Sequence, residues 1–225
     1  MNEKLVHPDW DFQISLSDGS STILVLEKQT LFRSTVVGIM NQCRGEIGDY
    51  VFSDDKKQFD LQDRMIVVSD PLNADPSNKR VSNAISQQIK DIIVSSDFYK
   101  EANDLVNHIE RFADSIEETH RLNLAHQEYE ISSLHKILNL QLQVEYENEL
   151  ERIMEFMNVS HDVCGIDCFT FVSLLSFFTP EEINTLVNEA TSNKHNLLLL
   201  EGYEPDYVPV LTRKIIIDKD DCQIF

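Results

Sequence analysis

Three short apolar runs, each ending on a carboxylate, constrain the fold of this 225-residue chain more than any other feature. They read TILVLEK at residues 22–28, RMIVVSD at residues 64–70 and NLLLLEG at residues 196–202. Continuous aliphatic runs of this length, bounded by polar residues, are typical of strands that are buried on both faces. Because segments with helical spacing alternate with such runs, we expect an α/β fold built on a parallel sheet.

A further strand is expected at residues 10–16, where apolar and polar side chains alternate with a period of two. The pair Asp18-Gly19 lies between this segment and the apolar run at residues 22–28. An Asp-Gly pair between two strand patterns is a strong signal for a two-residue hairpin turn. The sequence therefore predicts a hairpin near the N-terminus, with one half-solvated strand and one buried strand.

The middle of the chain has helical spacing. Apolar residues recur at three- and four-residue steps over residues 81–118, and Ser95-Ser96-Asp97 is expected to kink this segment. A single helix of that length would extend about 57 Å, which suggests an arm rather than part of a compact domain. A second helix is expected at residues 127–137 and a third at residues 147–158, joined by a short extended piece, with continuous helix as the alternative.

Strand patterns occupy both ends of the chain, so the economical interpretation is one α/β head domain interrupted by a helical insertion. We place the head at residues 1–76 and 161–225, and the helical leg at residues 77–160.

The strand ends carry acids where a nucleotide enzyme would carry a phosphate-binding loop. Glu27, Asp70 and Glu201 are expected near the carboxyl edge of the sheet, either as helix caps or in solvent. A P-loop needs GxxxxGK followed by Ser or Thr, whereas residues 27–33 read EKQTLFR and contain no glycine. The sequence also lacks GxGxxG, HExxH and GxSxG, and we therefore expect no enzyme activity.

The four cysteines and the absence of a long apolar run indicate a cytosolic protein. Cys164 and Cys168 are one residue too far apart for the usual zinc or redox pair, and we expect them to be buried as small apolar side chains. No apolar run approaches the roughly 20 residues that span a bilayer, and the N-terminal residues lack the pattern of a signal peptide.

The net charge of −20 argues against loose binding to nucleic acid, because a strongly negative field repels a phosphate backbone. A DNA site on such a chain would have to be a concentrated basic patch. The helical middle contains six basic residues: Lys90, Lys100, Arg111, Arg121, Lys136 and Arg152. The first three fall within about 80° of one another on an ideal helical wheel, so they either line a groove or merely interrupt an acidic surface.

The order of these segments resembles a known family, the CRISPR-associated spacer-acquisition accessory proteins of type II-A systems, known as the small Csn family. The matching segments are TILVLEKQTLF, RMIVVSDPLNAD and FTFVSLLSFFTPEEINTLVNEA, the last leading into NLLLLEG. The resemblance covers nearly the whole chain. It implies a degenerate nucleotide-kinase-like parallel-sheet head without a working P-loop, with an α-helical leg inserted in it.

The resemblance also implies a function. Members form ring-shaped homotetramers that bind calcium between head and leg, thread double-stranded DNA through a basic channel and slide inward from its ends. Without known catalysis of their own, they assist the integrase complex and the RNA-guided effector nuclease in acquiring new spacers for antiviral defence. Two alternatives stay open: a protein-interaction scaffold of the adaptation complex that does not bind DNA, and a degenerate nucleotide- or phosphate-binding enzyme.

The resemblance assigns site residues unevenly. Glu130 keeps an acidic position of the calcium segment, Glu128 lies close by, and Asp70 matches an acid at the end of the second buried strand. Ala125 and Gln127 stand where further acids are expected. For DNA binding, Lys136 lies nearest to a matching leg position and Arg152 comes next. The remaining DNA-binding assignments follow from topology alone: Lys90, Lys100, Arg111 and Arg121.

Overall fold

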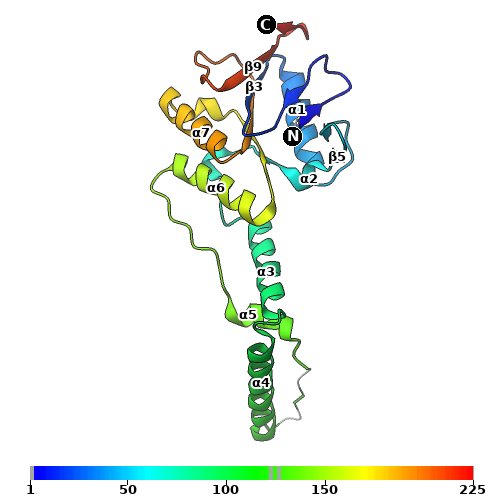
Figure 1. The fold of residues 1–225 in the computed structure, drawn as a ribbon, viewed down its shortest axis with the longest axis vertical. Coiled ribbons are helices and arrows are strands. Elements are labelled where there is room, and N and C mark those ends of the chain that lie inside the picture. Colours follow the sequence, from blue (N-terminus) through cyan, green and yellow to red (C-terminus); the bar gives the residue numbers. More distant parts are fainter. Residues whose placement is uncertain (1–2, 122–123, 126–127, 225) are drawn as a thin grey trace. The chain divides into compact units, whose positions relative to one another are not determined.

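The computed structural model describes residues 3–121, 124–125 and 128–224 (Figure 1). The chain divides into two compact units. The head unit comprises Met1–Pro76 and Val144–Phe225, and the inserted unit comprises Ser77–Gln143.

A six-stranded sheet with the order β10-β9-β3-β8-β7-β6 forms the centre of the head unit. The strands β9, β3, β8, β7 and β6 run parallel to their neighbours, and the short edge strand β10 is antiparallel to β9. This arrangement confirms the expected α/β fold with a parallel sheet. The bounds are β3 Ser21–Leu26, β6 Met65–Val68, β7 Cys168–Val172, β8 Asn196–Glu201, β9 Thr212–Ile217 and β10 Gln223–Ile224.

Two of the three apolar runs, in β3 and β8, are buried on both faces of this sheet as predicted. The third run forms the edge strand β6, where Ile66 and Val67 are half-buried. In β3, Ile23 belongs to one hydrophobic cluster and Leu24 to the other, and Leu197 and Leu198 divide in the same way in β8. Helices α6 and α7 contribute to the first cluster, and α1 and the second sheet contribute to the second. The head helices are α1 Gln29–Gln42, α2 Leu61–Arg64, α6 Glu149–Cys164 and α7 Pro180–Ser192, with short 3-10 turns at η1 Pro71–Asn73 and η3 Leu174–Ser176.

A second, antiparallel sheet of four strands was not expected from the sequence. Its order is β2-β1-β4-β5, and its strands are only two or three residues long. Such short strands leave almost no periodic pattern in a sequence. Their bounds are β1 Lys4–Val6, β2 Ile14–Ser15, β4 Val51–Ser53 and β5 Gln58–Phe59.

The predicted N-terminal hairpin is wrong, although the turn itself is present. Asp18 and Gly19 adopt positive φ angles of 55° and 78°, but β2 pairs with β1 while β3 pairs with β8 and β9. The backbone N–H groups of Gly19 and Ser20 donate to the side-chain oxygen of Asn196, each at 3.1 Å. The turn therefore connects the two sheets. Pairing with β8 on one side and β9 on the other allows β3 to be buried completely.

The boundary between the units after the insertion lies at residues 143 and 144, and not at residue 160 as the sequence pattern predicts. The difference arises from α6, which the sequence pattern places in the leg. Ile153, Phe156 and Met157 of this helix are buried in the same cluster as Phe169 of β7. This apolar face makes α6 a part of the head.

The inserted unit is helical, as expected, but its long segment is two helices. They are α3 Lys79–Ile93 and α4 Tyr99–Thr119, and the break between them contains the Ser95-Ser96-Asp97 sequence expected to kink the segment. The expected helix at residues 127–137 lies partly outside the described residues. Within the described part of this segment, the structure has a 3-10 turn, η2 Ile131–Ser133, followed by α5 Leu134–Leu138.

The expected extended piece at residues 138–146 forms no strand. A small cluster of Ile93, Ala102, Val106 and Leu134 holds α3, α4 and α5 together. In the part of the chain that the structure describes, no helix combines the length and apolar character needed to cross a bilayer.

Candidate nucleic-acid interface

The turn after β3, where a P-loop would bind phosphate, is occupied by protein side chains. Lys28 precedes the first residue of α1, and its ammonium group forms an ion pair with Asp221. No glycine lies between β3 and α1 that would let the backbone wrap around a phosphate. The sheet is therefore present without the loop that nucleotide hydrolysis needs.

The three acids at the strand ends have different environments. Asp70 is exposed and accepts a hydrogen bond from Asn73 at 2.6 Å, and Glu27 is half-buried. Glu201 is completely buried, which departs from the expectation of a cap or a solvated acid. Its Oε1 accepts the backbone N–H of Leu175 at 3.0 Å, and burial raises its pKa to about 7. Glu201 is thus largely protonated at mildly acidic pH.

Five of the six basic residues predicted to bind DNA lie in the inserted unit. Lys90 is on α3, Lys100 and Arg111 are on α4, Arg121 follows α4, and Lys136 is on α5. Lys90 is half-buried and the other four are exposed. None of the five forms an ion pair with another residue described in the structure. These cations are therefore available to an external anion.

Three of the twelve basic residues of the head, in contrast, have ion-pair partners. Lys28 pairs with Asp221, Arg64 with Glu3 and Asp167, and Lys214 with Glu204. The formal charge differs between the units as well. Residues 77–143 contain seven basic and ten acidic residues, a net charge of −3, whereas the rest of the chain carries −17. The inserted unit is thus the part of the protein that repels a polyanion such as DNA least.

Helix α4 places Lys100 and Arg111 on one side. Eleven residues are close to three helical turns, so the two side chains lie about 16 Å apart along the axis and roughly opposite the buried Ala102 and Val106. Asp104 falls on the same side of the helix. A single inserted unit therefore presents separate cations on a face of mixed charge, and not a continuous basic stripe.

The sixth predicted DNA contact, Arg152, lies in the head unit on α6. It is half-buried, and its guanidinium carbon lies 5.8 Å from the ring centre of Tyr146. Its Nε is buried and has no hydrogen-bond partner among the described residues. Arg152 is less accessible than the exposed cations of the inserted unit, and its contact with DNA stays a prediction.

Two of the three predicted calcium ligands line one cavity of the inserted unit. Glu128 and Glu130 border a space of about 760 Å³ together with Glu110 and Asp114 of α4. Sequence reasoning missed Glu110 and Asp114, although their separation of four residues puts them on one side of a helix. Asp70 belongs to the other unit.

Carboxylate oxygens are the donors that Ca²⁺ prefers, and it takes six to eight of them. Within the described residues, however, no three His, Cys, Asp or Glu side chains are grouped closely enough to hold a metal ion. Glu130 instead accepts a hydrogen bond from Ser132 at 3.3 Å. Calcium binding at Glu128 and Glu130 therefore stays a prediction of the family resemblance.

Together, these features define a class: α/β proteins with a mainly parallel sheet, no glycine-rich loop after β3, and a helical insertion. A family model described as CRISPR-associated protein (Cas_Csn2) matches residues 42–221 of the chain. Because this match spans well over half of the sequence, the chain belongs to the Csn2 family. The resemblance found in the sequence is thereby confirmed.

Solved structures resemble this one to different degrees. The crystal structure of Stu0660 of Streptococcus thermophilus matches with a TM-score of 0.57 and 11% identity, covering 97% of this chain and 74% of that one. The ADP conformation of MJ1267, an ATP-binding cassette of an ABC transporter, matches with a TM-score of 0.42 and 10% identity, covering 91% of this chain and 82% of that one. The TM-score of the second structure is too low for that structure to support an argument. No curated protein sequence matches the chain.

Proposed function

We propose that this chain is a non-enzymatic protein that binds double-stranded DNA as a ring-shaped homotetramer and supports the acquisition of new CRISPR spacers. Membership of the Csn2 family supports a role in CRISPR adaptation. The observation that carries the DNA-binding part is the set of five basic side chains in the inserted unit without an ion-pair partner among the described residues. In a chain of net charge −20, basic groups without internal partners are the groups best able to contact phosphates.

Assembly into a ring would make these few contacts sufficient for tight binding to DNA. The cations of one inserted unit are separate and share their surface with acids, so one copy would bind DNA weakly. Four copies arranged around a duplex would bring about 20 such groups to the phosphates. Because each phosphate contact releases counterions, the affinity should fall steeply as the salt concentration rises.

The proposal assigns no catalysis to the protein. The turn between β3 and α1 has no phosphate-binding glycines, and its lysine is paired with Asp221. Within the adaptation machinery we expect the ring to act with the integrase complex and the RNA-guided effector nuclease by holding DNA ends.

Calcium remains a prediction of the family resemblance. If it binds, Glu128 and Glu130 are the side chains to test, because they share a cavity with two other carboxylates. A thermal-shift titration with CaCl₂ should stabilise the native protein more than the E128Q/E130Q variant. Equal responses of the two proteins would remove these residues from the proposal.

The decisive experiment compares linear and closed circular DNA of the same sequence in a gel-shift assay. A ring that loads from ends should shift the linear duplex and leave the closed circle free. The K100Q/R111Q variant should bind the linear duplex at least tenfold more weakly. The K56Q/K219Q variant removes the same charge from exposed positions of the head and should bind like the native protein.

Two results would contradict the proposal. If linear DNA does not shift at low salt, with or without calcium, the DNA-binding part fails and the scaffold alternative is favoured. If light scattering gives a monomer or dimer under the conditions that shift DNA, the ring fails. Turnover of ATP with magnesium would instead favour the degenerate-enzyme alternative.

A further inference from the structure

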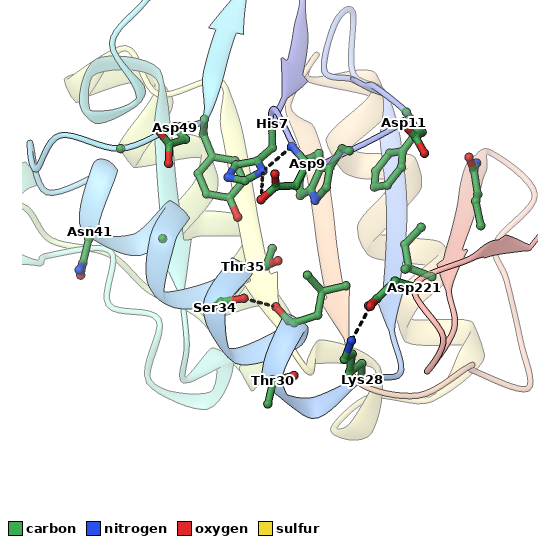
Figure 2. A pocket seen from close by; sticks show the side chains of 18 of the residues that line it. His7, Asp9, Asp11, Lys28, Thr30, Ser34, Thr35, Asn41, Asp49 and Asp221 are labelled. Carbon is green, nitrogen blue, oxygen red and sulfur yellow. Dashed lines mark hydrogen bonds and ion pairs between the residues drawn. The ribbon is translucent and has the colours of Figure 1, made fainter.

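One cavity of the head unit is lined by none of the six basic residues predicted to bind DNA. It has a volume of about 850 Å³ and is bordered by residues 7–12, residues 46–50 and one side of α1, with contributions from the C-terminal segment (Figure 2). Its walls are built from aromatic rings and carboxylates, two groups that both attract cations.

The aromatic wall comes from four rings in mutual contact. Trp10 stacks on Phe12, with ring centres 4.8 Å apart and planes 13° apart, and meets the edge of Tyr50 at 5.4 Å. His7 lies 4.6 Å from Tyr50. Tyr50 is only 6% exposed, and a hydrogen bond joins its side chain to that of Thr35. The wall is therefore held in place before any ligand binds.

The charges that line the cavity are mostly negative. Lys28 is the only lysine or arginine among the described lining residues, and it is paired with Asp221. Figure 2 shows this pair on one side of the cavity and Asp9, Asp11 and Asp49 on the other. Besides Asp221, the acids that line the cavity are Asp9, Asp11, Glu46 and Asp49.

His7 lies beside one of these carboxylates. Its Nδ1 accepts the backbone N–H of Asp9 at 3.2 Å and lies 3.8 Å from the Asp9 carboxylate. The negative field also reaches the aromatic wall. Burial raises the pKa of Tyr50, and the carboxylates of Asp9 and Asp49 add to the rise.

The same charges exclude other ligand classes. A nucleotide would bring phosphates next to four carboxylates, and an uncharged apolar ligand would desolvate them without compensation. A guanidinium group fits both walls, because it stacks on aromatic faces and donates paired hydrogen bonds to carboxylates. The head unit, with its large share of the net charge of −20, would also attract a basic protein over a distance.

We propose that this cavity, the aromatic–acidic pocket, binds an arginine side chain of a basic partner protein. The pocket would be a docking point on the head that is independent of DNA binding by the inserted unit. The fully exposed Ile47 at its border would contact the apolar part of the arginine or its neighbours in the partner.

The pocket supplies its own reporter, because Trp10 is the only tryptophan of the chain. The probe is the peptide acetyl-Gly-Arg-Gly-Arg-Gly-amide, titrated while the fluorescence of Trp10 is recorded. The control peptide carries citrulline, a neutral group of the same shape, in place of each arginine. We expect saturable fluorescence changes with the arginine peptide and at least tenfold weaker binding of the citrulline peptide.

Matched variants test the location. E46Q/D49N removes two exposed carboxylates of the pocket and should weaken the arginine peptide about tenfold, while the circular dichroism spectrum and the DNA gel shift stay unchanged. D55N/D206N removes two exposed acids of the head outside the pocket and should bind like the native protein. Equal weakening by both double variants would show a diffuse charge effect and overturn the proposal.

Two further titrations decide the ligand class. If spermidine, a small polyamine, changes the Trp10 fluorescence at lower concentrations than the arginine peptide, the pocket is a small-cation site and not a protein docking point. If ATP with magnesium competes with the peptide, the argument from charge is wrong. Failure of the DNA gel shift alone would leave the proposal for this pocket standing.

Discussion

Replacing Glu201 by Gln is expected to remove a pH-dependent loss of stability. Glu201 ends β8, the strand between β3 and β7, and none of its surface is exposed. One carboxylate oxygen accepts the N–H of Leu175, and the other has no hydrogen-bond partner among the described residues. A charge at this position is therefore poorly solvated, and burial raises the pKa from 4.5 to about 7.

The direction in which the free energy of unfolding changes with pH follows from proton binding to Glu201. Between pH 4.5 and about 7 the folded protein holds a proton on Glu201 that the unfolded chain has lost. The free energy of unfolding therefore falls as the pH rises through this window, and the loss is complete above it. The interval between 4.5 and about 7, at about 1.4 kcal/mol per pH unit, corresponds to about 3 kcal/mol.

The E201Q variant keeps the carbonyl that accepts from Leu175 and carries no charge. At pH 8.5 it should be more stable than the native protein by up to about 3 kcal/mol, and near pH 4.5 the two should be about equal. Urea unfolding followed by the fluorescence of Trp10, from pH 4.5 to 8.5, measures the difference in the head unit.

The D55N variant controls for a general effect of charge, because Asp55 is exposed on the loop between β4 and β5. Its difference from the native protein should be small at every pH. If the stability gain of E201Q does not grow with pH, the buried carboxyl is not the titrating group and the reasoning is refuted.

Two further substitutions test the head by urea unfolding. Arg64→Ala should destabilise it by about 3 kcal/mol, because Glu3 and Asp167 lose the guanidinium to which they bind; a loss below about 1 kcal/mol would contradict a structural role for this network. Thr179→Ala should cost about 1 kcal/mol by removing the cap of α7, in which Thr179 and Glu182 satisfy each other's backbone N–H groups. Thr179→Ser keeps the hydroxyl and should be nearly neutral, so an equal loss in both variants would point to packing of the methyl group instead.

The sequence was most informative where a signal depends on residues close together in the chain. The capping box of α7 is such a signal: Thr179 and Glu182 have the spacing of this motif in the sequence, and the box forms in the structure because all of its atoms lie within one helical turn. The runs around Ile23 and Leu199 predicted buried strands correctly, because only a strand covered on both faces can bury every side chain of such a run. The same patterns supported the family resemblance.

Pairing and burial were decided by the tertiary structure. The turn at Asp18 and Gly19 was predicted, but the partner of β3 depends on which strands complete the sheet, and β8 lies more than 170 residues away in the chain. The sequence pattern predicts α6 as a part of the leg, whereas in the structure its apolar face packs in the same cluster as Phe169 of the head. Neither the partners of β3 nor the burial of α6 can be predicted from a short stretch of sequence.

The candidate sites show the same division. The basic residues Lys100 and Arg111 could be named from the sequence, because their spacing on one helix is a local property. The burial of Glu201 and the aromatic–acidic pocket could not, because each depends on segments that only the folded chain brings together. Local sequence determines which surfaces a segment offers, and the fold determines which of those surfaces are covered, since burial depends on the complementary surfaces of distant segments.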